Sequence, residues 1–277
     1  MNRNGALHLA GIVFLLALLW LALAAGAQAS SADATWPSAD GTVVDSNGKL
    51  VIDESHMSEG YVMCRLSSPS GNRMKMRVTF SSTQLIYDLN TAGNYETFPL
   101  QLGSGSYQFE LMENVKGNKY SLAGKLVVNV SLIDRNAAYL APNQYVNYSI
   151  FTDAVKKSDE ITAGLSGQQE IFQAVTNFIQ KEFTYDFVRA ATISSGQLPD
   201  INGCYSRRSG ICQDLSAVMC CMLRVQGVPC KLVIGYVNGS YYHAWTLSVL
   251  DGQEVFFDPT AALGCLNASS YSVERMY

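Results

Sequence analysis

The chain has 277 residues, enough for about two domains, and its hydrophobic content of 48% is ordinary for a globular protein. Charged residues make up 15% of the chain, and the formal net charge at pH 7 is −4. Because nucleic-acid-binding domains carry a basic excess, this balance excludes nucleic acid as an expected partner.

Residues 1–29 have the pattern of an export signal peptide. Arg3 supplies positive charge, Gly11 to Ala25 form an apolar core, and Ala27-Gln28-Ala29 is a small-x-small cleavage site. The alternative is an uncleaved anchor, because the apolar stretch approaches the length of a bilayer span. We therefore expect a secreted, extracellular protein that contacts the membrane only if this segment is retained.

Residues 36–135 are rich in short segments with strand character, separated by turns of Ser, Gly and Asn. The segments with β-branched or aromatic residues are 61–66, 75–80, 84–89, 107–112 and 125–133. Their spacing predicts a small β-sandwich-like domain. Because this region has no cluster of His, Asp or Cys, we interpret it as a structural or docking module.

Residues 139–277 change to helical patterning around Pro142, which marks the predicted domain boundary. Residues 148–165 are predicted to be helical, and a second helix is predicted after Ser166, where a capping-box spacing occurs. About twenty residues with no clear pattern then precede Cys212. A loop of that length in a compact domain is usually functional, so we expect it to form one wall of a substrate cleft.

Cys212 opens the next predicted helix. Asp214 lies in its first turn, where a carboxylate suits the positive end of the helix dipole. Gly227 and Pro229 predict its end, and the residues between are apolar on nearly every side, which is typical of a buried helix. Cys212 is therefore expected at the exposed N-terminal end, where a thiol ionises more readily than a free cysteine does.

Two hairpin turns follow this helix, at Asn238-Gly239 and Asp251-Gly252. A two-residue turn at the second pairs Leu250 with Gln253, and the register then places His243 and Asp258 on one face. They become diagonal neighbours within side-chain reach. The prediction depends on the turn length, because a four-residue loop would move the two side chains further apart.

The other cysteines leave two possibilities open in an exported protein. Cys220 and Cys221 lie within the apolar helix and are interpreted as small core residues. The candidates for disulfide bonds are Cys204, Cys230 and Cys265. Their pairing cannot be deduced from one sequence, and free thiols are an equal alternative.

A cysteine at a helix start, a histidine on one strand and an aspartate on the next resemble the transglutaminase-like superfamily, relatives of the papain-like cysteine proteases. The matching pieces are Gly210-Ile211-Cys212-Gln213-Asp214, His243-Ala244-Trp245 and Asp258-Pro259-Thr260, within residues 139–262. Residues 139–146 also resemble secreted bacterial members with a β-rich N-terminal region. The resemblance implies an α+β fold and a catalytic triad of Cys212, His243 and Asp258.

The resemblance also implies acyl transfer. Cys212 would attack a carboxamide or peptide carbonyl to form a thioester, with His243 as base and Asp258 orienting the ring. An amine acceptor gives a cross-link and water gives hydrolysis, so transglutaminase and protease or amidase activities both stay open. The substrate would be a protein or peptide, including those of a cell wall, and neither a cofactor nor a metal ion is expected.

Two further points stay open at this stage. The backbone N–H of Cys212 is a natural oxyanion donor, and Gln144, Tyr185 and Tyr205 are alternatives for the second donor. The rival from another class is a cell-surface binding module that keeps the fold without catalysis, which thiol reactivity would distinguish.

Overall fold

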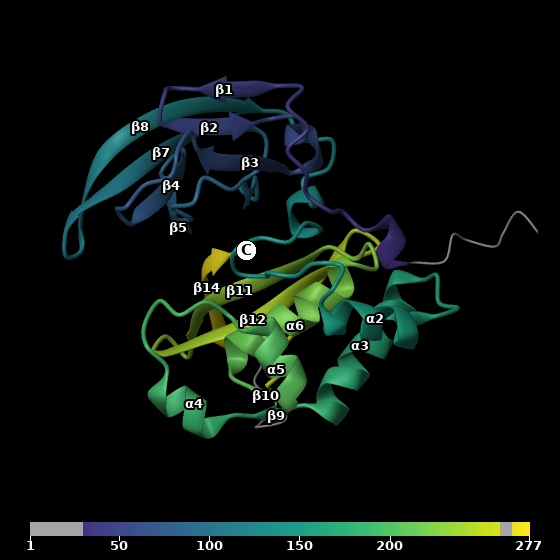
Figure 1. Cartoon of the computed structure of the whole chain (residues 1–277). Helices are drawn as coiled ribbons and strands as arrows, with labels where there is room; N and C mark the ends of the chain where they lie inside the picture. Colours follow the sequence, from purple (N-terminus) through teal and green to yellow (C-terminus); the bar gives the residue numbers. More distant parts are fainter. Residues whose placement is uncertain (1–29, 261–267) are drawn as a thin grey trace, which may run out of the picture.

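The computed structural model describes residues 30–260 and 268–277. The expected signal segment and Cys265 therefore lie outside the described residues. A short 3-10 helix, η1 (Ser31–Asp33), precedes a β-rich N-terminal region, and a mixed helical and β region follows it (Figure 1). Within the described ranges, no helix has the length and apolar character that a membrane span requires.

The N-terminal region contains two four-stranded sheets in which the strand pairs are antiparallel. One sheet has the order β1-β2-β3-β6 and the other β5-β4-β7-β8. The strands are β1 (Val44–Ser46), β2 (Leu50–Asp53), β3 (Tyr61–Leu66), β4 (Met74–Phe80), β5 (Thr83–Leu89), β6 (Glu96–Pro99), β7 (Gly105–Lys116) and β8 (Lys119–Val130). The short 3-10 helices η2 (Met57–Glu59) and η3 (Ala137–Tyr139) accompany them.

Alternating side chains explain why these strands form. In β4, Met74, Met76 and Val78 are buried while the residues between them are half-buried, as expected of a strand with one face on a core. Ile52 of β2 and Phe109 of β7 belong to the same buried cluster, so the two sheets share a core. The predicted strand segments are recovered with shifted ends: β7 is longer than predicted, and β8 begins before the predicted segment 125–133 and ends at Val130, so 131–133 are not part of the strand.

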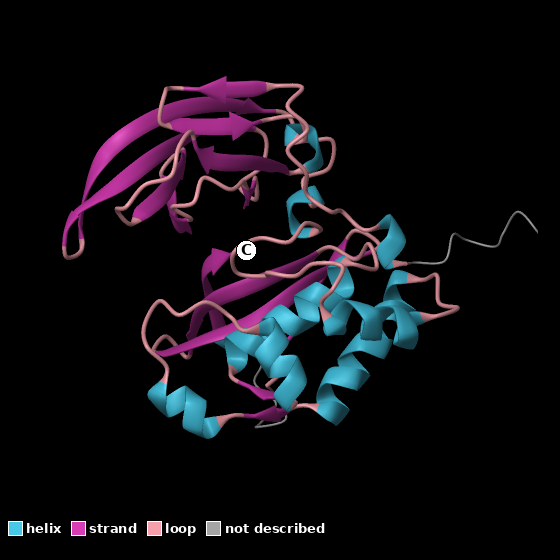
Figure 2. Cartoon of the chain, viewed as in Figure 1, coloured by secondary structure: helices cyan, strands magenta, loops and turns pink. Residues whose placement is uncertain are grey.

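The second region has one antiparallel sheet, in the order β13-β12-β11-β14. Figure 2 shows the helices gathered on the side of this sheet away from the N-terminal sheets. The helices are α2 (Asp153–Thr162), α3 (Gln168–Glu182), α4 (Phe187–Thr192), α5 (Ile201–Arg207), α6 (Cys212–Arg224) and η5 (Ala268–Ser270). The strands are β9 (Thr184–Tyr185), β10 (Ser209–Gly210), β11 (Cys230–Val237), β12 (Tyr241–Leu250), β13 (Gln253–Phe257) and β14 (Tyr271–Met276).

Helix α6 is the buried centre of this region. Every residue from Asp214 to Arg224 is buried, because α6 packs against β11 and β12 on one side and α2, α3 and α5 on others. This explains the apolar character of the helix on nearly every side. The predicted helix and its buried position are confirmed.

Both predicted hairpin turns form. Asn238 and Gly239 have φ of 50° and 73°, and Asp251 and Gly252 have φ of 48° and 81°. Positive φ at both central residues is the condition for the type I′ turn that two-residue hairpins favour. The second turn pairs Leu250 with Gln253 and Thr246 with Phe257, which is the predicted register.

The predicted twenty-residue loop before Cys212 was wrong, because the segment contains α4, α5 and β10. The Asp186 carboxylate caps α4 by accepting the N–H of Arg189 at 2.8 Å, and the Asp200 carboxylate caps α5 by accepting the N–H of Gly203 at 2.8 Å. Such caps stabilise helices too short to show an apolar repeat. Segment 193–199 between α4 and α5 remains irregular.

The two regions are joined through buried contacts. Tyr277 stacks on Tyr145 with ring centroids 3.6 Å apart, and both rings meet Tyr87 of β5 edge-on. Within the second region, the fully buried Arg224 holds the segments that carry Tyr145 and Tyr277 by donating to the carbonyl oxygens of Ala141 and Tyr277 at 2.7 and 2.8 Å. One cluster of buried apolar side chains includes residues of both regions. The core is therefore continuous between the regions, while independent folding of residues 36–135 and 139–277 stays a prediction.

The cysteines of the described residues are free thiols, and two of them meet in the core. Cys220 Sγ of α6 lies 3.3 Å from Cys230 Sγ of β11, and both residues are fully buried. A disulfide needs a separation of about 2.05 Å, so a small shift would allow the bond. Among the described cysteines, the partner available to Cys230 is thus Cys220, which we had interpreted as a core residue.

Refolding the protein with oxidised glutathione is expected to link Cys220 to Cys230, because their sulfur atoms already touch. Peptide mapping should then find this pair in a species that is two hydrogens lighter. Cys230→Ala should abolish the linkage, whereas Cys221→Ala, at an equally buried neighbouring position, should leave it intact. Recovery of both thiols in reduced form would contradict the prediction.

Candidate active site

Cys212 is the first residue of α6, and it is half-buried at the end of an otherwise buried helix. The backbone that leads into Cys212 is closely packed at Gly210. A Cβ added at Gly210 would lie 2.6 Å from Cys204 Sγ and 2.9 Å from Asp214 Cβ, so only glycine fits there without a shift. The predicted position of the thiol at a helix N-terminus is confirmed.

Asp214 fixes the start of α6 with a completely buried carboxylate. Its oxygens accept the backbone N–H of Ile211 at 3.2 Å, that of Asp200 at 2.9 Å, and the Nε–H of Arg189 at 2.9 Å. The side chain thus ties α4, α5 and α6 together behind Cys212. This agrees with the structural role expected of a carboxylate in the first turn of the helix.

His243 of β12 and Asp258, which follows β13, are in direct contact. Nε2 of His243 lies 2.8 Å from Oδ2 of Asp258, and both residues are buried, with 6% and 4% of their surface exposed. The hairpin register had placed these side chains on one face as neighbours, and the structure brings them together. Trp245 lies beside the imidazole on the same face, with ring centroids 6.5 Å apart.

The Asp258 carboxylate has three further donors. Thr260 donates its backbone N–H and its hydroxyl to Oδ1, at 2.8 and 2.7 Å, and the Tyr271 hydroxyl donates to Oδ2 at 2.7 Å. Sequence reasoning missed both residues as parts of the site. Thr260 could have been found, because Asp side chains often bond the backbone two residues on, whereas Tyr271 comes from the unpredicted strand β14.

The second imidazole nitrogen, Nδ1, is buried and has no hydrogen bond within the described residues. Cys212 lines the same cavity as His243, and its proximity contributes to a raised pKa of the ring. Catalytic hydrogen bonds in resting enzymes are often long or poorly aligned and tighten with substrate. The structure therefore pairs His243 with Asp258 and places Cys212 at the same cavity as His243.

The electrostatics of His243 and Asp258 favour their charged forms. Burial by itself lowers the pKa of His243, but Asp258 and Cys212 on its two sides outweigh burial and raise that pKa to about 9. Burial would raise the pKa of Asp258, but hydrogen bonds from His243, Thr260 and Tyr271 hold it below its ordinary value. At neutral pH the ring is thus an imidazolium paired with the Asp258 carboxylate.

Cys212 and His243 open into a cavity of about 600 Å³. Segment 193–197 forms one wall, as expected of the stretch before Cys212, and the side chain of Gln213 holds this wall by donating to the carbonyl of Gln197 at 3.0 Å. Tyrosines from β9, β12 and the linker line the rest of it: Tyr145, Tyr185, Tyr241 and Tyr242.

Tyr185 lies beside Cys212 because β9 pairs with β10, where Tyr185 is opposite Gly210. Burial, followed by the nearby Cys212 and Tyr241, raises the pKa of Tyr185, so its hydroxyl keeps its proton and can donate. The other two candidate oxyanion donors are elsewhere. The Gln144 amide bonds both backbone groups of Asp88, and the Tyr205 ring lies 4.0 Å beneath the guanidinium of Arg208.

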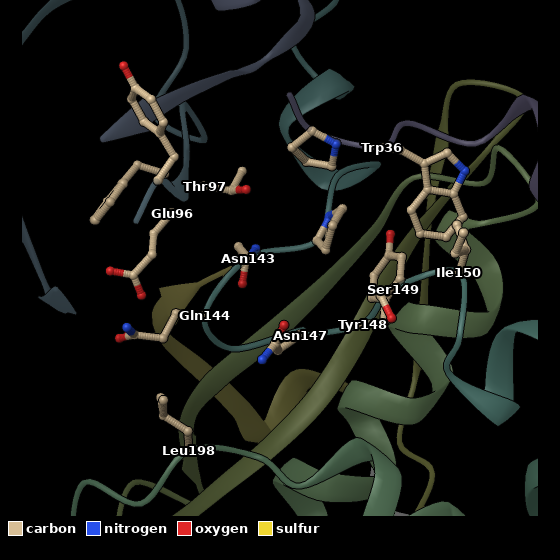
Figure 3. A pocket seen from close by; sticks show the side chains of 14 residues that line it. Trp36, Glu96, Thr97, Asn143, Gln144, Asn147, Tyr148, Ser149, Ile150 and Leu198 are labelled. Carbon is tan, nitrogen blue, oxygen red and sulfur yellow. The ribbon is translucent and has the colours of Figure 1, made fainter. Parts of the chain in front are cut away.

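A separate cleft of about 570 Å³ lies between the N-terminal sheets and the linker that follows them. Figure 3 shows Trp36, Glu96, Gln144 and Leu198 along its walls. None of the three candidate catalytic residues lines it. Within residues 30–260 and 268–277, no group of three or more His, Cys, Asp or Glu side chains is placed to hold a metal ion.

Residues 155–259 match the family model described as the Transglutaminase-like superfamily. This part of the chain is therefore a transglutaminase-like domain, and Cys212, His243 and Asp258 all lie within the matched range. The resemblance seen in the sequence is confirmed, as is the α+β fold with a β-rich N-terminal region.

Several solved structures are similar at low identity. A candidate cysteine protease from Cytophaga hutchinsonii is 12% identical, over 76% of this chain and 73% of that one, with a TM-score of 0.43. A candidate protease from Parabacteroides distasonis is 13% identical, over 68% and 38% of the two chains, with a TM-score of 0.36. Red sea bream transglutaminase is 12% identical, over 72% and 47%, with a TM-score of 0.31. No curated protein matches the chain.

Proposed function

We propose that this protein is an exported cysteine enzyme that transfers acyl groups from peptide or glutamine carbonyls through a thioester on Cys212. The observation that supports the proposal is the imidazole of His243, which contacts Asp258 through Nε2 at 2.8 Å and lines the same cavity as the helix-start Cys212. Nucleophile, base and orienting carboxylate in this order form the general arrangement for covalent acyl transfer.

The steps follow from the positions of the groups. The imidazolium stabilises the Cys212 thiolate, which attacks the carbonyl carbon of the substrate. The developing oxyanion is expected to accept from the backbone N–H of Cys212 and the hydroxyl of Tyr185. The Nδ1 proton of His243 then moves to the leaving amine as the C–N bond breaks, and the thioester remains on Cys212.

The acceptor decides which product forms. An incoming primary amine or a water molecule loses a proton to His243 and attacks the thioester, which restores the free thiol. The amine gives a cross-link, and water gives a hydrolysed product. Both reactions need the same three residues, so we propose the acyl transfer itself and leave the choice of acceptor to the experiment.

The test uses a culture-supernatant proteome as the source of acyl donors. Mature protein beginning at Ser30, the start expected after export, should attach a biotin-tagged primary amine to some of these proteins, or cleave some of them when the amine is left out. Cys212→Ala should lose both activities, because no other described cysteine contacts His243. Cys221→Ala is the matched control and should keep them.

A brief treatment with iodoacetamide at pH 6 gives a reading that needs no substrate. Cys212 should be alkylated first, because the imidazolium of His243 favours its thiolate, whereas Cys220 and Cys221 are fully buried. Equal labelling of all cysteines, together with no amine incorporation and no cleavage, would rule out the enzyme and favour a binding module.

A further inference from the structure

The described side chains that line the cavity beside Cys212 include basic residues but no acidic ones. Apart from His243, its described lining contains one basic side chain, Arg275, and no Asp or Glu. The rest of the lining consists of tyrosines and small polar or apolar residues. A buried anionic group of a substrate would therefore find its counter-charge at Arg275.

The sheet positions Arg275 in this cavity. In the β11–β14 ladder Arg275 is opposite Ile234, and in the β11–β12 ladder Ile234 is opposite Ala244. Directly opposed residues in a sheet point to the same face, so the three side chains form one row. All three line the cavity. His243 precedes Ala244 on β12, so its side chain starts from the other face of the strand, and it lines the same cavity.

The Arg275 guanidinium makes hydrogen bonds within the protein but does not use all of its N–H donors. Its Nη2 donates to the Tyr242 hydroxyl at 2.9 Å and lies 3.3 Å from Oε1 of Glu274. Nε is buried without a partner among the described residues, and 36% of the side chain is exposed. A guanidinium has five N–H donors in a planar fork that matches a carboxylate, so the protein leaves hydrogen-bonding capacity unused.

Glu274 does not cancel this charge. Its side chain is 41% exposed and does not line the cavity, and ion pairs between exposed side chains are worth little. A substrate carboxylate inside the cavity would meet Arg275 in surroundings with less water, where the same attraction is stronger. Arg275 is thus positioned for a ligand rather than for the stability of the fold.

We propose that Arg275 binds a carboxylate of the acyl donor, so that the enzyme selects anionic peptides over neutral ones. The inference rests on the proposed function, because it assumes that the acyl donor enters the cavity beside Cys212. Arg275 acts here as a specificity-determining residue. The carboxylate can belong to an acidic side chain or to a free C-terminus, and the chemistry of recognition is the same.

The experiment compares iodoacetate with iodoacetamide, two reagents of nearly equal size that differ in charge. In the native protein, part of any preference of Cys212 for iodoacetate comes from the imidazolium of His243. Arg275→Gln removes only the second cation and is expected to lower the iodoacetate-to-iodoacetamide rate ratio about three- to tenfold. High salt should reduce this difference, because it screens the interaction.

Two variants serve as controls. Arg275→Lys keeps the positive charge and should retain most of the ratio, which also covers the case in which Arg275→Gln perturbs the fold. Arg207→Gln changes the net charge equally at an arginine that is 48% exposed and does not line the cavity, so its ratio should equal that of the native protein.

Protection by peptides distinguishes the two sources of carboxylate. A glutamate peptide with an amidated C-terminus should slow the alkylation of Cys212 if a side chain is bound, and a neutral peptide with a free C-terminus should do so if the terminus is bound. In either case Arg275→Gln should abolish the protection.

The outcomes separate this inference from the proposed function. If Cys212 is selectively alkylated but Arg275→Gln has the same rate ratio as Arg207→Gln, Arg275 does not bind the carboxylate and the acyl-transfer proposal survives. If Cys212 reacts no faster than the buried cysteines with either reagent, both the proposed function and the role of Arg275 fail.

Discussion

Asp258→Asn is expected to lower the turnover of the acyl-transfer reaction by about 10⁴-fold while leaving the fold intact. A change of this kind in the Ser-His-Asp enzymes has that cost, because it stabilises the wrong tautomer of the histidine. Here the expected tautomer has the proton on Nε2, where Asp258 accepts it, and leaves Nδ1 to exchange a proton with Cys212.

The contacts of Thr260 make this effect predictable, because they determine the orientation of the side-chain amide of the substituted asparagine. Thr260 donates two hydrogen bonds to Oδ1 of Asp258, so the asparagine would keep its carbonyl oxygen at that position. Its NH₂ group would then replace Oδ2, which faces Nε2 of His243 at 2.8 Å. Nε2 must accept from that NH₂ group, and the proton moves to Nδ1, where it blocks the uptake of the thiol proton.

The pH dependence of alkylation tests the same pair without a substrate. The pKa of His243 is raised to about 9, above the ordinary value of about 6.5, so the imidazolium persists up to about pH 9 and is lost above it. In the native protein, Cys212 should thus react rapidly with iodoacetamide from pH 6 upward. In Asp258→Asn the imidazolium is lost at lower pH, and labelling at pH 6 should slow.

The control is Tyr271→Phe, which removes another hydrogen bond to the same carboxylate but leaves the partner of His243 unchanged. We expect it to cost at most about a hundredfold in turnover, because a single hydrogen bond to a charged group contributes about 1.5–3 kcal/mol. If Asp258→Asn has the alkylation profile and turnover of Tyr271→Phe, then Asp258 holds the turn at Thr260 and does not orient the ring.

The parts of the site that could be predicted depend on local rules. Cys212 was placed by the capping and burial pattern of one helix, and His243 and Asp258 were placed by a two-residue turn that fixes the register of one hairpin. In both cases the physical constraint acts between residues close in sequence. A helix dipole, a positive-φ turn and the alternation of a strand were sufficient.

The parts that were missed depend on contacts between distant residues. Strand β14 has mostly exposed or half-buried side chains, so its sequence has no apolar alternation from which to predict a strand. It forms because it pairs with the edge of β11. Tyr271 and Arg275 both come from this strand. The sequence pattern did not predict helices α4 and α5 either. They are stabilised by single caps and by hydrogen bonds to Asp214, which lies in another helix.

Asp214→Ala is expected to reduce the free energy of unfolding by about 3–5 kcal/mol, the range found when one partner of a buried ion pair is removed. The change leaves the Arg189 guanidinium without its buried partner, and it also leaves the backbone N–H groups of Ile211 and Asp200 without an acceptor. Each buried donor without a partner adds a desolvation penalty.

The matched control is Asp186→Ala, because the Asp186 carboxylate accepts one backbone N–H as the cap of α4, and the loss of such a cap costs about 1 kcal/mol. Urea denaturation of both variants measures the difference. Asp214→Ala should also slow the alkylation of Cys212 in the folded state, since Asp214 fixes the first turn of α6 relative to α4 and α5. If the two variants are equally stable, the contacts of Asp214 do not hold α4, α5 and α6 together, and the position of Cys212 must depend on the packing of α6 alone.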